Sequence, residues 1–174
     1  MSVAMDCITV YDSTMLSIAQ GSMAMRAAQL ANDGHPVATI RASLDSMKPR
    51  FSLYFMVDTL TYLQRGGRVS RGSSMMGGML NVKPILSLKD GEVVPVERVR
   101  SREKALEMMA DLVRQQGPLE EAYVLHTVAP DVAAQFAQSI QPLLGGLQAP
   151  ILPLGPVVGA NLGPGAIGVV TLRR

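Results

Sequence analysis

The sequence predicts an α/β fold in which a mixed sheet of about six strands, with helices on one face, makes up most of the chain. Three observations lead to this prediction. From residue 51 onward, short β-prone runs alternate with segments of helical periodicity. The pair Asp90-Gly91 separates two β-prone runs and indicates an antiparallel hairpin. The residues before 50 are too few to enclose a core, so we expect them to be the remnant of another α/β domain.

The first 50 residues predict one strand followed by two helices. These elements are expected over residues 7–11, 17–32 and 37–47. Asp12 and Ser13 end the strand, and Gly34 with Pro36 ends the first helix. A boundary at Met47-Lys48-Pro49-Arg50 then divides the chain into domains of residues 1–50 and 51–174.

The second domain predicts alternating strands and helices. Strands are expected over residues 51–57, 83–88, 93–99, 121–128, 149–154 and 166–172. Helices are expected over residues 58–64, 101–116 and 130–144, and a short loose one over 72–80. Ser101 is the expected N-cap of the second of these helices. We expect the helices near 58–64, 101–116 and 130–144 to cover the same face of the sheet.

Composition excludes several classes of protein. The 174 residues are 48% hydrophobic and 17% charged, which is typical of a globular domain and not of a disordered chain. A net charge of +2 without a basic, aromatic stripe argues against nucleic-acid binding. No apolar run approaches the roughly 18 residues that would span a membrane. A single cysteine, Cys7, and no signal-like start favour a cytoplasmic protein.

Three segments carry candidate binding residues, each with a structural alternative. Arg65-Gly66-Gly67-Arg68 offers guanidinium donors suited to a carboxylate or phosphate, or is only a helix-ending turn. Ser17 through Gly21 places small residues at a helix start, suited to an anion or to close helix packing. The loop from Asn161 to Gly165 can present amides to a head group, or serve as a tight connection.

The sequence does not predict a catalytic or metal site. His35 and His126 lie far apart, with no cysteine or acidic cluster at metal-ligand spacing. There is no Gly-x-Ser-x-Gly elbow and no Gly-x-Gly-x-x-Gly loop. We therefore expect no catalytic residue, no metal and no cofactor.

Taken together, the motifs resemble the DegV family, whose better-understood members are the fatty acid-binding subunits of bacterial fatty acid kinase. The matching stretches, in the family's order, are Tyr11-Asp12-Ser13 with Ser17 and Gly21, Asp58-Thr59-Leu60 with Tyr62-Leu63, Arg65 to Ser70, Asn81-Val82-Lys83-Pro84-Ile85, Asp90-Gly91, Val99-Arg100-Ser101 with Lys104-Ala105, and Gly163-Pro164-Gly165.

The chain departs from the family pattern in two ways. Family members are usually more than a hundred residues longer at the N-terminus, so this chain resembles a member that lacks most of its N-terminal domain. The family commonly has His just before the Gly-Pro-Gly loop, where this sequence has Asn161. An amide donates a hydrogen bond but carries no charge and transfers no proton.

The resemblance implies a protein that holds a long-chain fatty acid such as palmitate or oleate and presents its carboxylate to a separate kinase subunit. Arg68 is expected to neutralise the carboxylate or steady the loop that does. The expected ligand-binding residues are Arg68, Asn161, Ser17, Gly67, Arg100, Met75, Met76 and Met79. The three methionines suit an adaptable apolar lining, or else pack in the core.

Two alternative functions remain, a dihydroxyacetone kinase-like enzyme and an inactive scaffold fragment. A homodimer is expected to shield the first domain.

Overall fold

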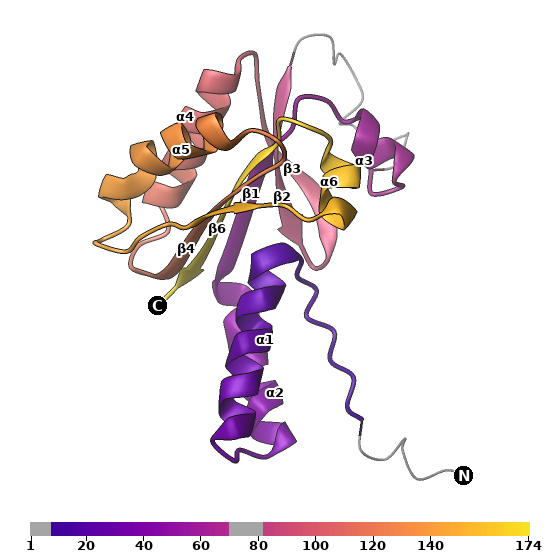
Figure 1. Ribbon diagram of the computed structural model, residues 1–174, viewed down its shortest axis with the longest axis vertical. Coiled ribbons are helices and arrows are strands. Elements are labelled where there is room, and N and C mark those ends of the chain that lie inside the picture. The colour runs from indigo at the N-terminus through magenta and orange to yellow at the C-terminus, as the bar shows by residue number, and fades with distance from the viewer. Residues whose placement is uncertain (1–7, 70–81) are drawn as a thin grey trace.

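The computed structural model describes residues 8–69 and 82–174 and contains one mixed sheet with helices on both faces (Figure 1). The strands are β1 (Phe51–Met56), β2 (Lys83–Lys89), β3 (Glu92–Val99), β4 (Leu119–His126), β5 (Ile151–Pro153) and β6 (Ile167–Arg173). The α-helices are α1 (Ser17–Asn32), α2 (Val37–Met47), α3 (Thr61–Arg65), α4 (Arg102–Arg114), α5 (Pro130–Ile140) and α6 (Pro156–Leu162). Short 3₁₀ turns follow α2 (Lys48–Arg50) and α5 (Gln141–Leu143).

The six-stranded mixed sheet is confirmed, with the order β3-β2-β1-β6-β4-β5. Every neighbouring pair is antiparallel except β4 and β5, which are parallel. The predicted hairpin joins β2 and β3, and both residues at its tip have positive φ, 51° at Asp90 and 82° at Gly91. Such values at both central residues match the right-handed twist of the paired strands, which explains the Asp-Gly signal.

Each face of the sheet has its own core. On one face, α4 and α5 pack Met109 and Phe136 against strand residues such as Val124 and Val169. Ser101 caps α4 as expected, because its hydroxyl accepts a hydrogen bond from the Lys104 backbone N–H at 3.2 Å. On the other face, α3 and α6 cover a second core, to which they contribute the residues Leu63 and Leu162.

The expectation that the helix near 58–64 shares a face with α4 and α5 is therefore not met, as Figure 1 shows. The chain leaves β1 with Val57 and Leu60 buried on the opposite face, and α3 follows them. Apolar spacing shows that a five-residue helix has a buried side, but the direction in which the chain leaves the strand decides which face it covers.

Residues 8–11 do not form the predicted strand; residue 7 lies outside the described residues. This segment instead runs along the α1–α2 hairpin, where the Tyr11 hydroxyl donates to Asp45 Oδ1 at 2.8 Å. Lys48 donates to the Asp12 carbonyl at 2.7 Å and its Nζ lies 4.5 Å from the centre of the Tyr11 ring. A β-prone run becomes a strand only where a partner strand is available, and none borders this segment among the described residues.

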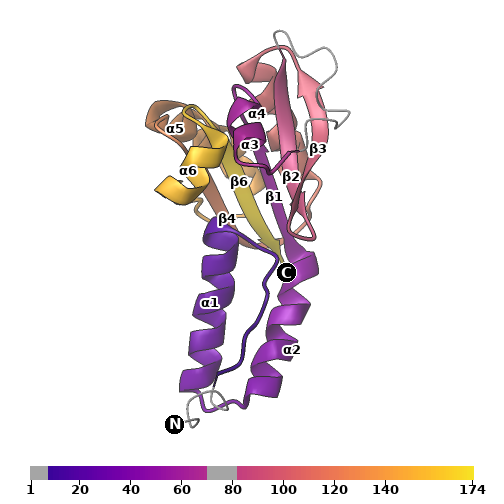
Figure 2. The ribbon, with the colours of Figure 1, turned by 90° about the vertical axis from the view of Figure 1, so that its right-hand side faces the viewer.

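The α1–α2 hairpin projects from the sheet (Figures 1 and 2) and contacts it through a small core. Met23, Leu44 and Met47 of the hairpin meet Leu172 of β6. The two predicted helix ranges, 17–32 and 37–47, agree with the structure. A single helix is expected over 130–144, but α5 ends at Ile140 and a 3₁₀ turn follows it. The reason is that Pro142 has no backbone N–H to donate to an α-helical hydrogen bond.

Candidate functional site

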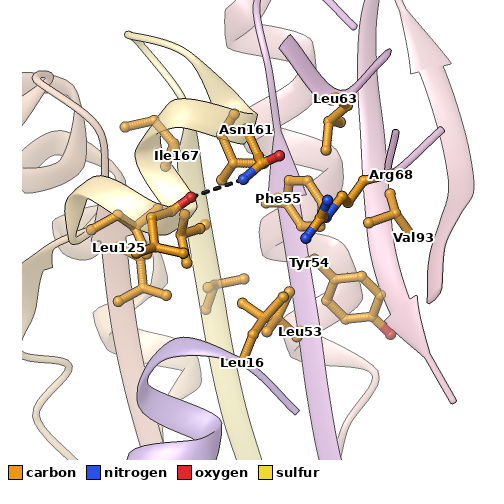
Figure 3. Close-up of a pocket in the computed structure, with 16 residues that line it drawn as sticks. Leu16, Leu53, Tyr54, Phe55, Leu63, Arg68, Val93, Leu125, Asn161 and Ile167 are labelled. Carbon is orange, nitrogen blue, oxygen red and sulfur yellow. Dashed lines mark hydrogen bonds between the residues drawn. The ribbon is translucent and has the colours of Figure 1, made fainter. Parts of the chain in front are cut away.

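A cavity of about 230 Å³ lies between the sheet and the two short helices α3 and α6 (Figure 3). Its floor is formed by residues of four strands, Leu53, Phe55, Val93, Leu125 and Gly168, and its cover includes Leu63, Val157, Val158 and Leu162. Among the described residues that line it, Arg68 and Asn161 offer polar side chains; the Tyr54 hydroxyl instead receives a hydrogen bond from Gln116 at 3.3 Å. The arrangement suits a long apolar ligand with one polar end.

Arg68 reaches the cavity because α3 ends in a Schellman motif. The Gly67 N–H donates to the Gln64 carbonyl at 3.1 Å, and the Arg68 N–H donates to the Leu63 carbonyl at 2.9 Å. Gly67 has φ of +69°, the left-handed conformation that this position requires and that favours glycine. The Arg68 guanidinium donates to the Gly66 carbonyl at 2.6 Å. The Arg-Gly-Gly-Arg motif is thus a helix-ending turn that also places an arginine at the cavity.

Asn161 lies on α6, whereas the sequence predicts that it belongs to a loop. Gly and Pro residues in and around this segment hide its helical character, and α6 begins with Pro156 at its first position and ends at Gly163, whose φ is +77°. The Asn161 Nδ2 donates to the Val157 carbonyl one turn earlier, at 2.8 Å (Figure 3). One donor of the amide is therefore used within the helix.

The two helices touch through glycines. A Cβ at Gly66 would overlap the Asn161 amide oxygen, and a Cβ at Gly163 would overlap the Tyr62 ring. These contacts set the distance between α3 and α6, and so bring Arg68 and Asn161 to the same cavity. Tyr62 belongs to the motif that starts at Asp58, and its packing against Gly163 has no signal in periodicity.

Thr127, directly after β4, holds the Gly-Pro-Gly loop in place, a role that sequence reasoning missed. Its hydroxyl donates to the Gly163 carbonyl and accepts from the Ala166 N–H at 2.9 Å. Its carbonyl also accepts from the Gly165 N–H at 2.8 Å. Because Thr127 is only 5% exposed, these bonds fix the C-terminal end of α6 to the sheet without competition from water.

Asp58 forms ion pairs with two basic side chains, Lys83 and Arg102, beside this loop. Its carboxylate accepts from Lys83 Nζ at 2.7 Å and from Arg102 at 2.6 Å. Partial burial opposes ionisation, but the two cationic hydrogen-bond donors prevail and hold the Asp58 pKa below its usual value. A Cβ at Gly165 would lie 2.6 Å from the Asp58 carboxylate, so glycine is needed for the loop to approach this ion cluster.

The other predicted site residues lie elsewhere or outside the described residues. Ser17 begins α1 with φ of 53°, and its neighbour Leu16, not Ser17 itself, lines the cavity. Gly67 forms the turn described above without lining the cavity. Arg100 follows β3 and is exposed, away from the cavity lining. Met75, Met76 and Met79 fall in the range 70–81, outside the described residues, as does the helix expected over 72–80.

The two histidines have separate surroundings. His126 is 9% exposed, and its Nδ1 accepts from the Ala129 N–H at 3.2 Å, next to the start of α5. His35 is exposed beyond the end of α1. Within residues 8–69 and 82–174, no three His, Cys, Asp or Glu side chains gather as a metal site. None of the helices in these ranges is both long enough and apolar enough to cross a membrane.

Comparison with known proteins relates the whole chain to one family. The family model that matches is described as an uncharacterised protein of the DegV family, and it covers residues 2–174. A DegV domain-containing protein of Listeria innocua is 34% identical over 165 residues, which are 93% of this chain and 58% of the relative.

Two crystal structures have the same fold. A fatty acid binding DegV family protein from Streptococcus agalactiae has a TM-score of 0.87 at 26% identity, covering 96% of this chain and 60% of that one. DegV, a fatty acid binding protein from Bacillus subtilis, has a TM-score of 0.82 at 33% identity, covering 94% and 60%. The chain thus spans about 60% of the length of the relatives it matches.

Proposed function

The chain belongs to the DegV family, and on that premise we propose that it binds a long-chain fatty acid such as palmitate or oleate in the cavity beneath α3 and α6. The observation that carries the proposal is the apolar lining with Arg68 and Asn161 as its polar side chains. Similarity to two solved proteins described as fatty acid binding supports the same ligand class.

The apolar lining accounts for affinity toward the acyl chain. Each methylene removed from water contributes about 0.8 kcal/mol. Leucine, valine and phenylalanine side chains from three strands, β1, β3 and β4, and from the helices α3 and α6 supply contact surface. A chain of this kind needs no hydrogen-bonding groups along its length, which suits a lining in which polar side chains are few.

The polar side chains account for the head group. A carboxylate buried without a partner is costly, and the guanidinium of Arg68 supplies a matching pair of donors. Figure 3 shows the Arg68 guanidinium beside Phe55, between Leu63 and Leu53, and the Asn161 amide nearer to Leu63 than to Leu16. We therefore orient the carboxylate toward Arg68 and the acyl chain over the strands.

Calorimetric titration of palmitate into the purified chain tests the proposal, with 1-hexadecanol as a control ligand of equal chain length and no charge. We expect saturable binding of palmitate and weaker binding of the alcohol, because only the acid pairs with Arg68. Mass spectrometry of an organic extract of the protein provides a second measurement. No heat with palmitate and no co-purifying fatty acid would leave the inactive scaffold as the better account.

The proposal extends to a separate kinase subunit that phosphorylates the bound carboxylate. Arg68 is exposed although it lines the cavity, which supports a head group that a second protein can reach. The test combines a fatty acid kinase catalytic subunit, ATP and palmitate, with and without this chain. Formation of acyl phosphate only when the chain is present supports the presentation role, and equal formation without it contradicts that role.

We also propose that the chain has two domains, residues 1–50 and 51–174, and is located in the cytoplasm. Two copies of the chain associate there through the first domain. Met25 of α1 and Val37 of α2 are 57% and 52% exposed, more than is usual for large apolar side chains in helices that pack on a core. Sedimentation velocity at rising concentration measures the association. A Met25→Glu variant is expected to remain monomeric under conditions in which the wild type dimerises.

A further inference from the structure

Gly168 is an unexpected residue in the middle of a central strand. Its neighbours along β6 are large or β-branched, namely Ile167, Val169, Val170, Thr171 and Leu172. The strand pairs with β1 on one side and β4 on the other, and Gly168 is buried. Glycine weakens a strand interior because it adds backbone freedom to the unfolded chain and packs no side chain.

Neither backbone conformation nor crowding requires a glycine at this position. Several of the described glycines have a positive φ, but Gly168 does not. A Cβ placed on it would lie 3.5 Å from Phe55 Cβ and 3.6 Å from Leu125 Cβ, which is ordinary van der Waals contact. Gly66 and Gly163 differ in this respect, because a Cβ on either would overlap a neighbouring side chain.

The missing side chain would point into the cavity. Gly168 pairs with Phe55 of β1 and with Leu125 of β4, and all three residues line the cavity floor. Phe55 and Leu125 belong to the core on the α3 and α6 face, so the position of a Cβ between them lies on that face. A larger residue at 168 would take up space that the floor now leaves open.

We propose that Gly168 determines ligand specificity by keeping a passage open across β6, between Phe55 and Leu125, through which an unbranched acyl chain runs. This inference rests on the proposed function, because it assigns the acyl chain to that passage. A side chain at position 168 displaces methylenes of the ligand, and each methylene that loses its burial weakens binding about fourfold.

The test compares the wild type with Gly168→Ala and Gly168→Val in calorimetric titrations of octanoate, laurate and palmitate. We expect palmitate to bind about fourfold more weakly to the alanine variant and more than tenfold more weakly to the valine variant. The loss is expected to grow with chain length. Gly21→Ala is the control, because it adds a methyl group in α1, also 3.5 Å from its nearest neighbour, Ile18, and outside the cavity lining.

Thermal unfolding separates a filled cavity from a damaged fold. Gly168→Ala is expected to unfold at or above the wild-type temperature, since the methyl group meets no clash. It therefore keeps the test decisive even when the valine variant folds poorly. Unchanged palmitate affinity in the alanine variant, or equal losses for octanoate and palmitate, would overturn the role of Gly168 while the binding function stands. A wild type that binds none of the three acids overturns the proposed function and this inference with it.

Discussion

Gly66 and Asn161 are in direct apposition across the two helices that cover the cavity. A Cβ at position 66 would overlap the amide oxygen of Asn161, whose nitrogen is held by the Val157 carbonyl at 2.8 Å. Gly66 itself has φ of −75°, which any residue adopts. Glycine is thus favoured at position 66 by the neighbouring side chain and not by its own backbone.

Gly66→Ala is expected to destabilise the fold by about 1–3 kcal/mol, the usual cost of inserting a methyl group into a packed contact. Asn161→Ala removes the obstructing amide, so most of the Gly66→Ala penalty should disappear in the double variant. Urea unfolding of the wild type, both single variants and the double variant measures this coupling. Additive effects in the four proteins would show that the two residues do not press on one another.

Arg68→Ala is expected to weaken palmitate binding by about 1–3 kcal/mol, the range for losing a hydrogen bond to a charged group. Because Arg68 is exposed, we expect the lower part of that range. Arg65→Ala is the matched control, since Arg65 precedes the same turn but does not line the cavity. Calorimetry measures both affinities, and equal losses in the two variants would point to a general charge effect.

Asn161→His is expected to tighten palmitate binding below pH 6, when the introduced imidazole is largely protonated and attracts the carboxylate. The ordinary pKa of histidine is about 6.5, so the gain should fade between pH 6 and 8. Titrations of wild type and variant at pH 5.5 and 8.0 make the comparison. An affinity ratio between the two proteins that stays constant with pH would argue against a charged contact at this position.

Asp58→Asn is expected to flatten the acid dependence of stability. The Asp58 pKa is lowered in the folded protein, so the unfolded chain binds the proton first as the pH falls past the ordinary value of about 3.9. The stability that Asp58 contributes is complete above about pH 5 and declines below it. Urea unfolding at pH 7 and pH 3 should show a smaller difference in the variant, while the exposed-site control Glu107→Gln keeps the wild-type difference.

Amide hydrogen exchange is expected to be faster in α1 and α2 than in β4 and β6. The hairpin meets the sheet through a small core around Met23, Leu44, Met47 and Leu172, whereas both faces of β6 are covered. Local opening should therefore require less free energy in the hairpin. Mass-spectrometric exchange on the monomer at low concentration measures this, and equal protection of the two regions would contradict it.

The sequence by itself determined the elements whose signals are local. Short β-prone runs and the Asp90-Gly91 turn identified all six strands of the sheet. Periodicity, with Ser101 as a cap, identified α1, α2, α4 and the first part of α5. Arg68 and Asn161 were singled out by the resemblance to family motifs, and the structure places both at one cavity. The strands and helices depend on residues close in the chain, so spacing carries enough information for them.

The tertiary structure alone decided what depends on distant partners. Residues 8–11 have β propensity, but no strand of the described part of the chain lies beside them, and α3 covers the face toward which the chain leaves β1. Thr127 and Gly168 gained their roles from neighbours on other strands and loops. A cavity exists only where segments far apart in sequence enclose it, so no local pattern could reveal its floor. Packing between non-adjacent elements is the physical reason that the site, unlike the strands, had to be seen in three dimensions.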